Sequence, residues 1–322
     1  MAARSGQPPK LAIVGASGTV GSQLAELLGQ RDFSFAELKL FGAPASAHAK
    51  PLLADEAGPE VNELESPKDL AGCDVVFLAT PAAPAAALMA ACPNSIQIDL
   101  SAANRAPSRG QPLVAPGLTP RARVLELRPG RAYGIPHPAA QIIAAVLRTL
   151  VIESEFVGAT VLLGASGTGR EAIATLFNQS ADLLNARLDL ADEETQTAFN
   201  LFLPADADML AGVIAAQVTE LSGKPHALAV QVARAPIFHG AAVAIFLPYR
   251  VDLPEWSGRL REAPGLILVE SGEASGSVEA AGQEAVIVKL TASPAGAVLW
   301  CVFDAARVAA LSAIWVAETV SA

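Results

Sequence analysis

The sequence predicts an α/β protein of two domains: an N-terminal domain on a parallel sheet and a C-terminal α+β domain with a mostly antiparallel sheet. Its 322 residues correspond to about two domains of roughly 150 residues each. Strand and helix patterns alternate in the first half, whereas strand patterns follow one another in the second. Hydrophobic residues make up 52% of the chain and aromatic residues 5%, which favours cores of small side chains and excludes a disordered chain.

The first half alternates strands and helices. A strand over residues 11–15 leads through a glycine turn into a helix over 19–30, whose apolar residues repeat at helical spacing. Further strands are predicted at 37–41, 74–79 and 96–100, with a helix near 84–92. This alternation predicts a parallel sheet with right-handed crossovers.

The pattern changes around residues 132–138, where Gly134, Pro136 and Pro138 follow in quick succession. We expect the domain junction there, with residues 1–132 and 304–322 in the first domain and 133–303 in the second. The second half is predicted to contain helices at 139–150 and 170–187 and strands at 157–163, 227–233, 241–247, 266–270, 286–291 and 296–303. A helix over the last twenty residues is expected to pack on the first domain.

Charge and cysteine content exclude several classes of protein. The chain has 22 basic and 32 acidic residues and a formal net charge of -10, the wrong sign for a nucleic-acid partner. Cys73, Cys92 and Cys301 are odd in number and widely spaced, which excludes a disulfide framework and a CxxC site. A reducing compartment, the cytoplasm, is therefore expected.

No membrane partner is expected. The longest uncharged run, residues 75–92, is interrupted by Pro81 and Pro84, which favours a strand and a helix over a membrane span. Residues 1–10 lack an apolar stretch, so they are interpreted as a short tail and not as a signal peptide.

The sharpest motif is a glycine-rich loop between the first strand and the first helix. It reads Gly15-Ala16-Ser17-Gly18-Thr19-Val20-Gly21. Glycines let the backbone approach a pyrophosphate, and the helix N-terminus supplies free N–H groups. The loop predicts a Rossmann-type domain that binds NADP or NAD; the alternative is a helix-packing turn without a ligand. The end of the second strand carries neither an acidic nor a basic selector, so Ser46, His48 or Lys50 could contribute, or that loop is simply solvated.

A second glycine loop, residues 164–169, follows the strand at 157–163. It is not a nucleophile elbow, because Thr168 replaces the last glycine, nor a P-loop, because no Gly-Lys-Ser/Thr follows. Its Ser166 and Gly167 could bind an anion or a cofactor carboxamide, or form a simple turn.

The histidines predict no metal site. His48, His137, His226 and His239 do not stand at ligand spacing with another His, Cys or carboxylate. His137, at the junction, and His239, before a strand, are candidates for acid-base groups; the alternative is that both are structural or solvated.

Six segments carry a longer pattern. They are the loop at Gly15, Ile98-Asp99-Leu100-Ser101-Ala102-Ala103-Asn104-Arg105, Pro112-Leu113-Val114-Ala115-Pro116, Ser166-Gly167-Thr168-Gly169, Ala198-Phe199-Asn200 and Asp304-Ala305-Ala306-Arg307. In this order they resemble the aspartate-semialdehyde dehydrogenase family, and in several respects its Usg-type branch, nearly end to end. The resemblance implies a Rossmann domain, a second domain for catalysis and homodimer formation, and an NADP-dependent reaction in amino-acid biosynthesis.

The same resemblance implies that the catalytic apparatus is incomplete. The family's nucleophilic cysteine aligns with His137, and its catalytic histidine aligns with Ala241. Gln141 is preserved beside the nucleophile position, and Arg105 and Arg234 survive from the phosphate- and substrate-binding set. Imidazole is a weak nucleophile beside a thiolate, and losing a covalent nucleophile costs several orders of magnitude in rate.

Three functions follow from this sequence. The first is a dimeric semialdehyde-dehydrogenase homologue that has lost the reaction and serves as a pseudoenzyme binding a small molecule or a partner. The second is an NAD(P)-dependent oxidoreductase with altered, non-covalent chemistry that uses His137 or His239. The third is a structural subunit that pairs with an active paralogue.

Overall fold

The computed structural model describes residues 7–42, 60–107, 111–120, 124, 128–152, 156–191, 194–224, 226–248, 252–270, 272–273 and 275–321. The chain divides into two compact units. Unit 1 contains residues 1–137 and 309–322, and unit 2 contains residues 138–308. Both boundaries lie slightly later in the chain than the predicted ones at 132/133 and 303/304.

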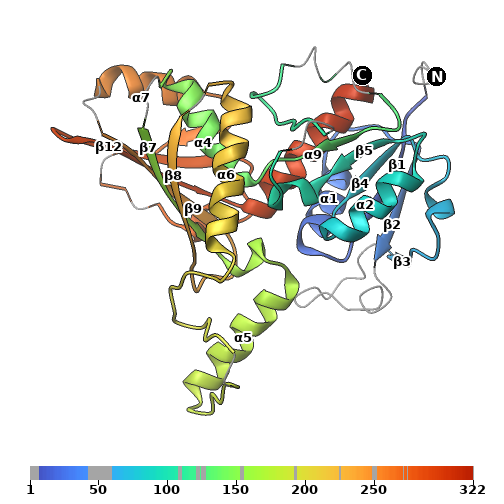
Figure 1. Cartoon of the computed structure of the whole chain (residues 1–322), viewed down its shortest axis with the longest axis horizontal. Coiled ribbons are helices and arrows are strands. Elements are labelled where there is room, and N and C mark those ends of the chain that lie inside the picture. The colour runs from blue at the N-terminus through green and yellow to red at the C-terminus, as the bar shows by residue number, and fades with distance from the viewer. Residues whose placement is uncertain are drawn as a thin grey trace. The chain divides into compact units, whose positions relative to one another are not determined.

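Unit 1 is built on a six-stranded sheet in which every pair of neighbours is parallel. The strand order is β3-β2-β1-β4-β5-β6 (Figure 1). The strands are β1 (Lys10–Val14), β2 (Glu37–Gly42), β3 (Asn62–Glu63), β4 (Val75–Leu78), β5 (Ile96–Asp99) and β6 (Ala132–Gly134). The predicted parallel sheet is confirmed, and the central strands are continuous apolar runs because both of their faces are buried.

Alternate residues of β1 explain how both faces are covered. Leu11 and Ile13 pack in a core with α1 (Thr19–Gln30) and α9 (Ala305–Ser321). Ala12 and Val14 face the other way, into a core that holds Leu88 of α2 (Ala82–Ala91). Successive side chains of a strand point to opposite faces, so one strand supplies both cores. Two 3-10 helices, η1 (Pro67–Leu70) and η2 (Leu100–Asn104), complete the unit's regular elements among the described residues.

Unit 2 contains a mixed sheet in the order β10-β11-β12-β9-β7-β8. Its strands are β7 (Phe156–Leu163), β8 (Ala227–Arg234), β9 (Ala241–Leu247), β10 (Leu266–Leu268), β11 (Val286–Ser293) and β12 (Gly296–Phe303). Three of the five pairings are antiparallel, and the pairs β7–β8 and β10–β11 are parallel. The predicted α+β domain with a mostly antiparallel sheet is therefore confirmed.

Helices cover one face of this sheet more completely than the other. α4 (Pro138–Thr149) and α6 (Ala207–Ser222) pack on each other, and they contact β9 and β8 respectively. Along β7 the odd-numbered residues are buried, whereas the even-numbered ones are only partly buried or exposed. The remaining helices are η3 (Ala165–Gly167), α5 (Arg170–Leu184), α7 (Leu253–Glu262) and α8 (Ser277–Ala280).

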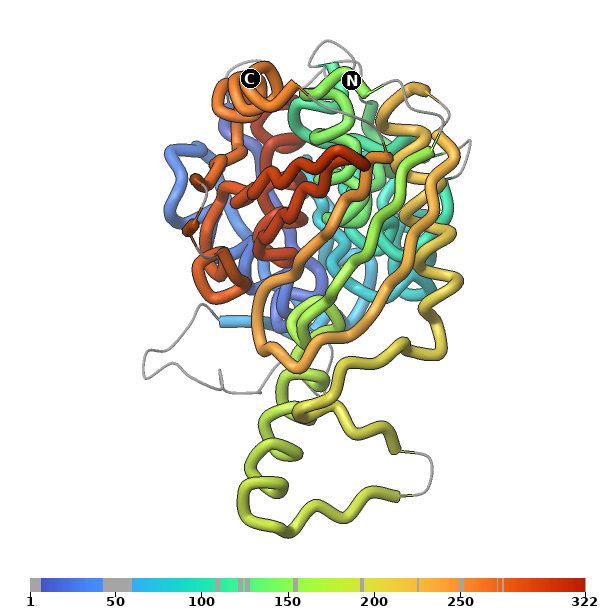
Figure 2. The backbone as a smooth tube through the Cα atoms, turned by 90° about the vertical axis from the view of Figure 1, so that its left-hand side faces the viewer, coloured from blue at the N-terminus to red at the C-terminus, as the bar shows by residue number. Residues whose placement is uncertain are grey.

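α5 extends beyond the end of the unit 2 sheet, and the segment after it returns alongside (Figures 1 and 2). The side chain of Gln179 ties the two together, because its Oε1 accepts hydrogen bonds from the N–H and the hydroxyl of Thr197, at 2.7 and 2.9 Å. The predicted helix over 170–187 ends early, at Leu184, since Ala186 adopts a left-handed φ of 52°.

Some elements differ from the predictions. α6 and α7 were not predicted, and the strand expected at 266–270 ends at Leu268. α2 begins two residues before the expected helix at 84–92, because a proline is tolerated in a helix's first turn. No helix in the described part of the chain is long and apolar enough to cross a membrane.

Candidate functional sites

The glycine-rich loop of unit 1 is shaped by contacts that only glycine permits. Gly15 has a φ of 90°, and a Cβ on it would collide with the carbonyl oxygen of Ala79. A Cβ on Gly21 would collide with the carbonyl of Gly15 and lie 2.8 Å from the Cα of Ala16. The first turn of α1 therefore sits directly on the loop, a close approach typical of a dinucleotide-binding turn.

Backbone hydrogen bonds show which part of the loop is free to bind an anion. The amides of Gly15 and Ala16 donate to the Phe41 carbonyl at 2.8 and 2.9 Å, and the Gly18 amide donates to the Gly15 carbonyl at 3.0 Å. The first bond of the helix itself runs from Ser22 N–H to Gly18 O, so the amides of residues 19–21 have no partner within the helix. The anion-binding part of the predicted loop is thus the start of α1.

Two threonine hydroxyls beside this loop lack partners. Thr19 Oγ1, in the first turn of α1, and Thr80 Oγ1, just after β4, are buried without a hydrogen bond among the described residues. β1 and β4 are neighbours, and the strand order reverses between them, which is where ligands bind in open α/β sheets. A tight cradle and orphaned hydroxyls fit the diphosphate of a dinucleotide.

Arg105, predicted to bind phosphate or substrate, has a buried partner. Its Nη2 donates to Oδ2 of Asp99, whose side chain is fully buried, and to Gln111 Oε1 at 3.0 Å. Gln111 Nε2 donates to the same Asp99 oxygen at 2.6 Å, and the Ser101 hydroxyl donates to the other at 2.6 Å. The guanidinium therefore neutralises a buried carboxylate at the end of β5.

The predicted nucleophile position lies at the end of unit 1. His137 is buried and follows β6, and Gln141 is buried in the first turn of α4 in unit 2. His137 is therefore the last residue of this part of unit 1, and Gln141 belongs to unit 2. Neither Cys73, Cys92 nor Cys301 lies in this segment, and all three are free and buried.

Three other candidates meet at one edge of the unit 2 sheet. Leu163, the last residue of β7, pairs with Arg234 at the end of β8 and with Ala241 at the start of β9. Beyond the strands, the Ser166 amide donates to the Phe238 carbonyl at 2.9 Å. Ser166 in η3 and the exposed His239 before β9 thus lie beyond the same strand ends as Arg234, the last residue of β8.

This edge holds polar atoms that fit an anionic ligand. Ser166 is only 4% exposed, and its hydroxyl lacks a partner among the described residues, as does Nη1 of Arg234. Burial lowers the pKa of the Arg234 guanidinium, and the negative charge of Asp206 opposes that shift. A carboxylate or phosphate would supply the missing acceptor, because arginine binds both in bidentate geometry.

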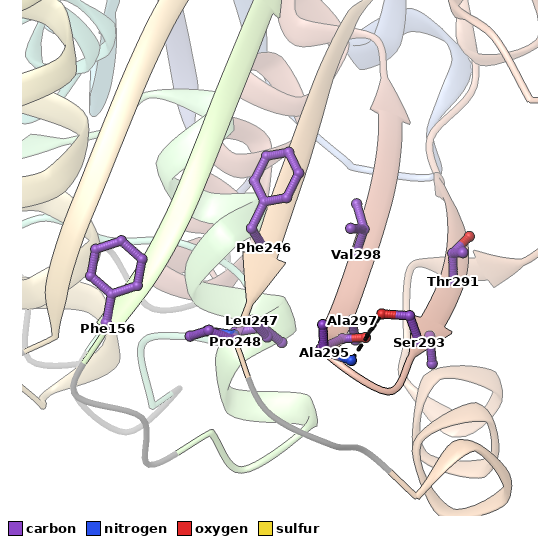
Figure 3. Close-up of a pocket in the computed structure, with 11 residues that line it drawn as sticks. Phe156, Phe246, Leu247, Pro248, Thr291, Ser293, Ala295, Ala297 and Val298 are labelled. Atoms are coloured by element: carbon purple, nitrogen blue, oxygen red, sulfur yellow. Dashed lines mark hydrogen bonds between the residues drawn. The ribbon is translucent and has the colours of Figure 1, made fainter.

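A further cavity opens at the far end of the same sheet. It has a volume of about 290 Å³ and is lined by residues of β7, β9, β11 and β12 (Figure 3). Phe246 pairs with Gly158 on one neighbouring strand and with Val298 on the other, and Phe156 lies two residues before Gly158 on the same face. No charged residue lines the cavity.

Among the described residues no cluster of His, Cys, Asp and Glu could hold a metal ion. The cofactor-selecting candidates Ser46, His48 and Lys50 lie outside the described residues.

The sequence missed Thr80, Gln111 and Asp206; only Thr80 had a usable signal, since it directly follows a buried strand.

Similarity to known proteins agrees with this architecture. Residues 10–137 match the family described as semialdehyde dehydrogenase, NAD binding domain. A USG-1 protein homolog of Azotobacter vinelandii is 32% identical, with 86% of each chain covered, and one of Pseudomonas aeruginosa is 31% identical, with 97% covered. The chain belongs to the aspartate-semialdehyde dehydrogenase family. A probable aspartate-semialdehyde dehydrogenase of P. aeruginosa has a similar fold, with a TM-score of 0.84, 30% identity, and coverage of 97% of this chain and 98% of that one.

Membership of the aspartate-semialdehyde dehydrogenase family agrees with the predicted resemblance and with both sheets described above. The matched NAD-binding domain coincides with the unit that holds the glycine loop, Thr19 and Thr80.

Proposed function

We propose that this protein is an aspartate-semialdehyde dehydrogenase homologue that binds a nicotinamide dinucleotide and a small anionic ligand but has lost the dehydrogenase reaction. The observation that carries the proposal is that every thiol in the chain is buried. Burial raises the pKa of Cys73 and of Cys92, and it raises the pKa of Cys301 to about 12. At neutral pH none supplies the thiolate that covalent aldehyde oxidation needs.

The general base is proposed to be missing as well. Ala241 is fully buried at the start of β9, and an alanine side chain cannot accept a proton. The nearest histidine in sequence, His239, is exposed on the loop before the strand. No thiolate would therefore form the covalent intermediate with the aldehyde, and no base at the family position would accept the proton that leaves on hydride transfer.

Binding features support the retained half of the proposal. In unit 1 the amides at the start of α1 and the hydroxyls of Thr19 and Thr80 would hold the diphosphate of NADP or NAD. When bound, such a dinucleotide supplies hydride transfer. In unit 2 the Arg234 guanidinium and the Ser166 hydroxyl would hold a carboxylate of the small ligand.

Calorimetry and a rate measurement test the proposal together. NADP and NAD are titrated into the protein, and phosphate-dependent oxidation of aspartate semialdehyde is then followed at saturating cofactor. We expect cofactor binding and a turnover at least about 10⁴-fold below that of an active family member, as the loss of a covalent nucleophile implies. A rate comparable to such an enzyme that survives His137→Ala would refute the loss of the reaction.

A second candidate function is a non-covalent NAD(P)-dependent oxidoreductase. The specific observation in its favour is that the exposed His239 is carried by the loop that adjoins Ser166 and Arg234. A histidine there could exchange a proton with a bound carbonyl or hydroxyl group. Consumption of NADPH with small aldehydes that His239→Ala abolishes would favour this function over the first.

We also propose that the protein is a homodimer through unit 2. On one face of the sheet Phe156 is 50% exposed and Phe246 is 43% exposed. The smaller residues Gly158, Thr160 and Ala244 lie beside them on the same face. A two-fold pairing would place the rings of one copy on the small residues of the other. The cavity on this face has no charged residue in its lining, which avoids repulsion between two copies of an acidic chain there.

The cytoplasm is the proposed location, because three free thiols suit a reducing compartment. Cell fractionation of a tagged full-length chain would test it.

A further inference from the structure

The segment from α5 to the start of α6, residues 170–206, forms an arm that extends beyond the end of the unit 2 sheet (Figures 1 and 2). Five of its large hydrophobic residues are 57–79% exposed: Phe177, Leu184, Phe199, Leu201 and Leu203. Single exposed apolar residues are normal on a protein surface, whereas several on one segment mark an interaction site. The arm is therefore a candidate docking surface.

The arm is separate from the surface proposed for the homodimer. Phe156 begins β7 at the end of the sheet that holds the apolar cavity. The arm follows the opposite end of β7, after Leu163 and the turn at residues 164–169. The strand between these two ends is about 23 Å long. A partner on the arm therefore leaves the proposed homodimer face free.

The second half of the arm contains a short extended segment, residues 199–203. Exposure alternates along it, so that the three odd-numbered residues lie on one face. Phe202 forms an antiparallel bridge with Arg234 of the edge strand β8, with N–H to oxygen distances of 3.2 and 2.8 Å. Leu201 and Leu203 make no backbone–backbone hydrogen bond within the described part of the chain. Their N–H and C=O groups are therefore those of an open sheet edge.

This segment is held in a fixed conformation. Oε1 of the buried Gln179 accepts hydrogen bonds from the N–H groups of Thr197 and Ala198, at 2.7 and 3.3 Å. The next residue, Phe199, has a left-handed φ of 56°, a conformation that is strained for an aromatic residue and that often marks a functional site. A preformed segment loses little conformational entropy when a partner binds.

Charge identifies the kind of partner that fits the arm. Its 37 residues include seven acidic and two basic ones, a net charge of -5, which is half of the formal net charge of -10 of the whole chain. Asp182, Asp189 and Asp206 are exposed. Such an arm repels the same arm of a second copy, and it repels an anionic lipid surface. A basic protein is attracted to it.

We propose that the arm is a docking site for a basic partner protein, which adds an extended apolar segment to the edge at residues 199–203. The backbone groups of Leu201 and Leu203 would pair with that segment, and the exposed row of side chains would pack against its alternate side chains. Lysine or arginine residues next to the segment would approach Asp189 and Asp206.

Random peptides displayed on phage and selected on the immobilised full chain serve as the probe. We expect the selected peptides to alternate apolar residues and to contain an excess of lysine and arginine. The best peptide is then synthesised and titrated by fluorescence anisotropy. The double variant Leu201→Ser, Leu203→Ser should bind it at least about tenfold more weakly, because two apolar contacts are lost. Leu253→Ser changes a leucine that is 44% exposed on α7 and should bind it within about twofold of the original protein.

Two further measurements make the test specific. The peptide's affinity should fall by at least about fivefold when salt rises from about 0.05 to about 0.5 M, because salt screens exposed charges. Both variants should melt within about 2 °C of the original protein, since they alter exposed side chains.

Three outcomes would overturn the proposal. The first is a selection that enriches no peptide or enriches peptides without basic residues. The second is a peptide that binds the double variant as tightly as the original protein. The third is a double variant with a smaller assembly mass in analytical ultracentrifugation, which would make the edge an interface between copies of this chain.

Discussion

Arg105 donates a hydrogen bond from Nη2 to Oδ2 of Asp99, a carboxylate that is completely buried at the end of β5. Gln111 bridges the same two residues, since it accepts from Arg105 and donates to Asp99. Within this cluster, which also includes Ser101, the arginine compensates a carboxylate charge that water cannot reach.

Removing this arginine should destabilise unit 1. Breaking a buried ion pair from one side costs about 3–5 kcal/mol, and because the Arg105 side chain is 34% exposed, we expect about 2–3 kcal/mol for Arg105→Met. Urea denaturation measures the loss. In the double variant, Asp99→Asn should cancel much of the stability lost on Arg105→Met. A double variant that loses the sum of the two single losses would mean that the pair is not coupled.

The glycine loop gives a prediction with an internal control. A Cβ on Gly21 would collide with the Gly15 carbonyl, so Gly21→Ala should lower the free energy of unfolding by at least about 2 kcal/mol. Gly29 lies in the same helix with nothing within 4 Å of its Cβ position, so Gly29→Ala should be neutral or stabilising by up to about 1 kcal/mol. Equal effects of the two changes would contradict the contact.

Alkaline pH should destabilise the protein through Cys301. Burial raises the pKa of this thiol from an ordinary 9.0 to about 12. The unfolded chain therefore loses the proton first, and stability that is complete below about pH 9 is lost as the pH approaches 12, by about 4 kcal/mol at most. Urea titrations from pH 8 to 11 should show a steeper fall for the original protein than for Cys301→Ala. Parallel curves would exclude this thiol as the cause.

Arg234 should destabilise the ligand-free protein. Its guanidinium is largely removed from water, which lowers its pKa, and Nη1 has no partner in the described structure. Arg234→Met should therefore raise the free energy of unfolding by about 1 kcal/mol, and it should abolish any heat signal from aspartate, which serves as a carboxylate probe for the proposed small ligand. Arg259→Met, in an exposed pair with Glu255 on α7, should change stability by less than about 0.5 kcal/mol. A strongly destabilised Arg234→Met variant would argue for a structural role.

The open face of unit 2 predicts an assembly state. Analytical ultracentrifugation should give twice the 33.0 kDa chain mass, and Phe246→Asp should shift the protein to the monomer because it places a charge in an apolar interface. Phe177→Asp changes a comparably exposed ring on α5 and should leave the dimer intact. A dimer that survives Phe246→Asp would show that the interface lies on another surface.

Local sequence patterns determine most of the fold. Val75–Leu78 could be predicted as a strand because a strand buried on both faces is a continuous apolar run. α6 escaped prediction because Gly212 and the β-branched Val213, Ile214 and Val218 disfavour an isolated helix, whereas packing on α4 and β8 stabilises one. α7 had a usable signal: Asp252 caps it by accepting from the Glu255 amide.

For the candidate sites too, contiguous motifs could be predicted from the sequence, whereas contacts between distant segments could not. The loop from Gly15 to Gly21 is contiguous, so its motif was visible in the sequence. Thr80 acquires meaning only once β4 is known to lie beside β1, and Arg105 only once Gln111 approaches Asp99. Burial of Arg234 likewise depends on the fold of unit 2.

Unit 1 is interrupted in sequence by the whole of unit 2, and this has a consequence during synthesis. The core around Leu11 and Leu24 includes Ala310, Ile314 and Ala317 of α9, which the ribosome makes after most of unit 2. Unit 2 is continuous and can fold as soon as it emerges. Unit 1 therefore remains incomplete, with one side of its sheet uncovered, until α9 has been made. A chain cut short before Ala309 would expose that side to chaperones and proteases.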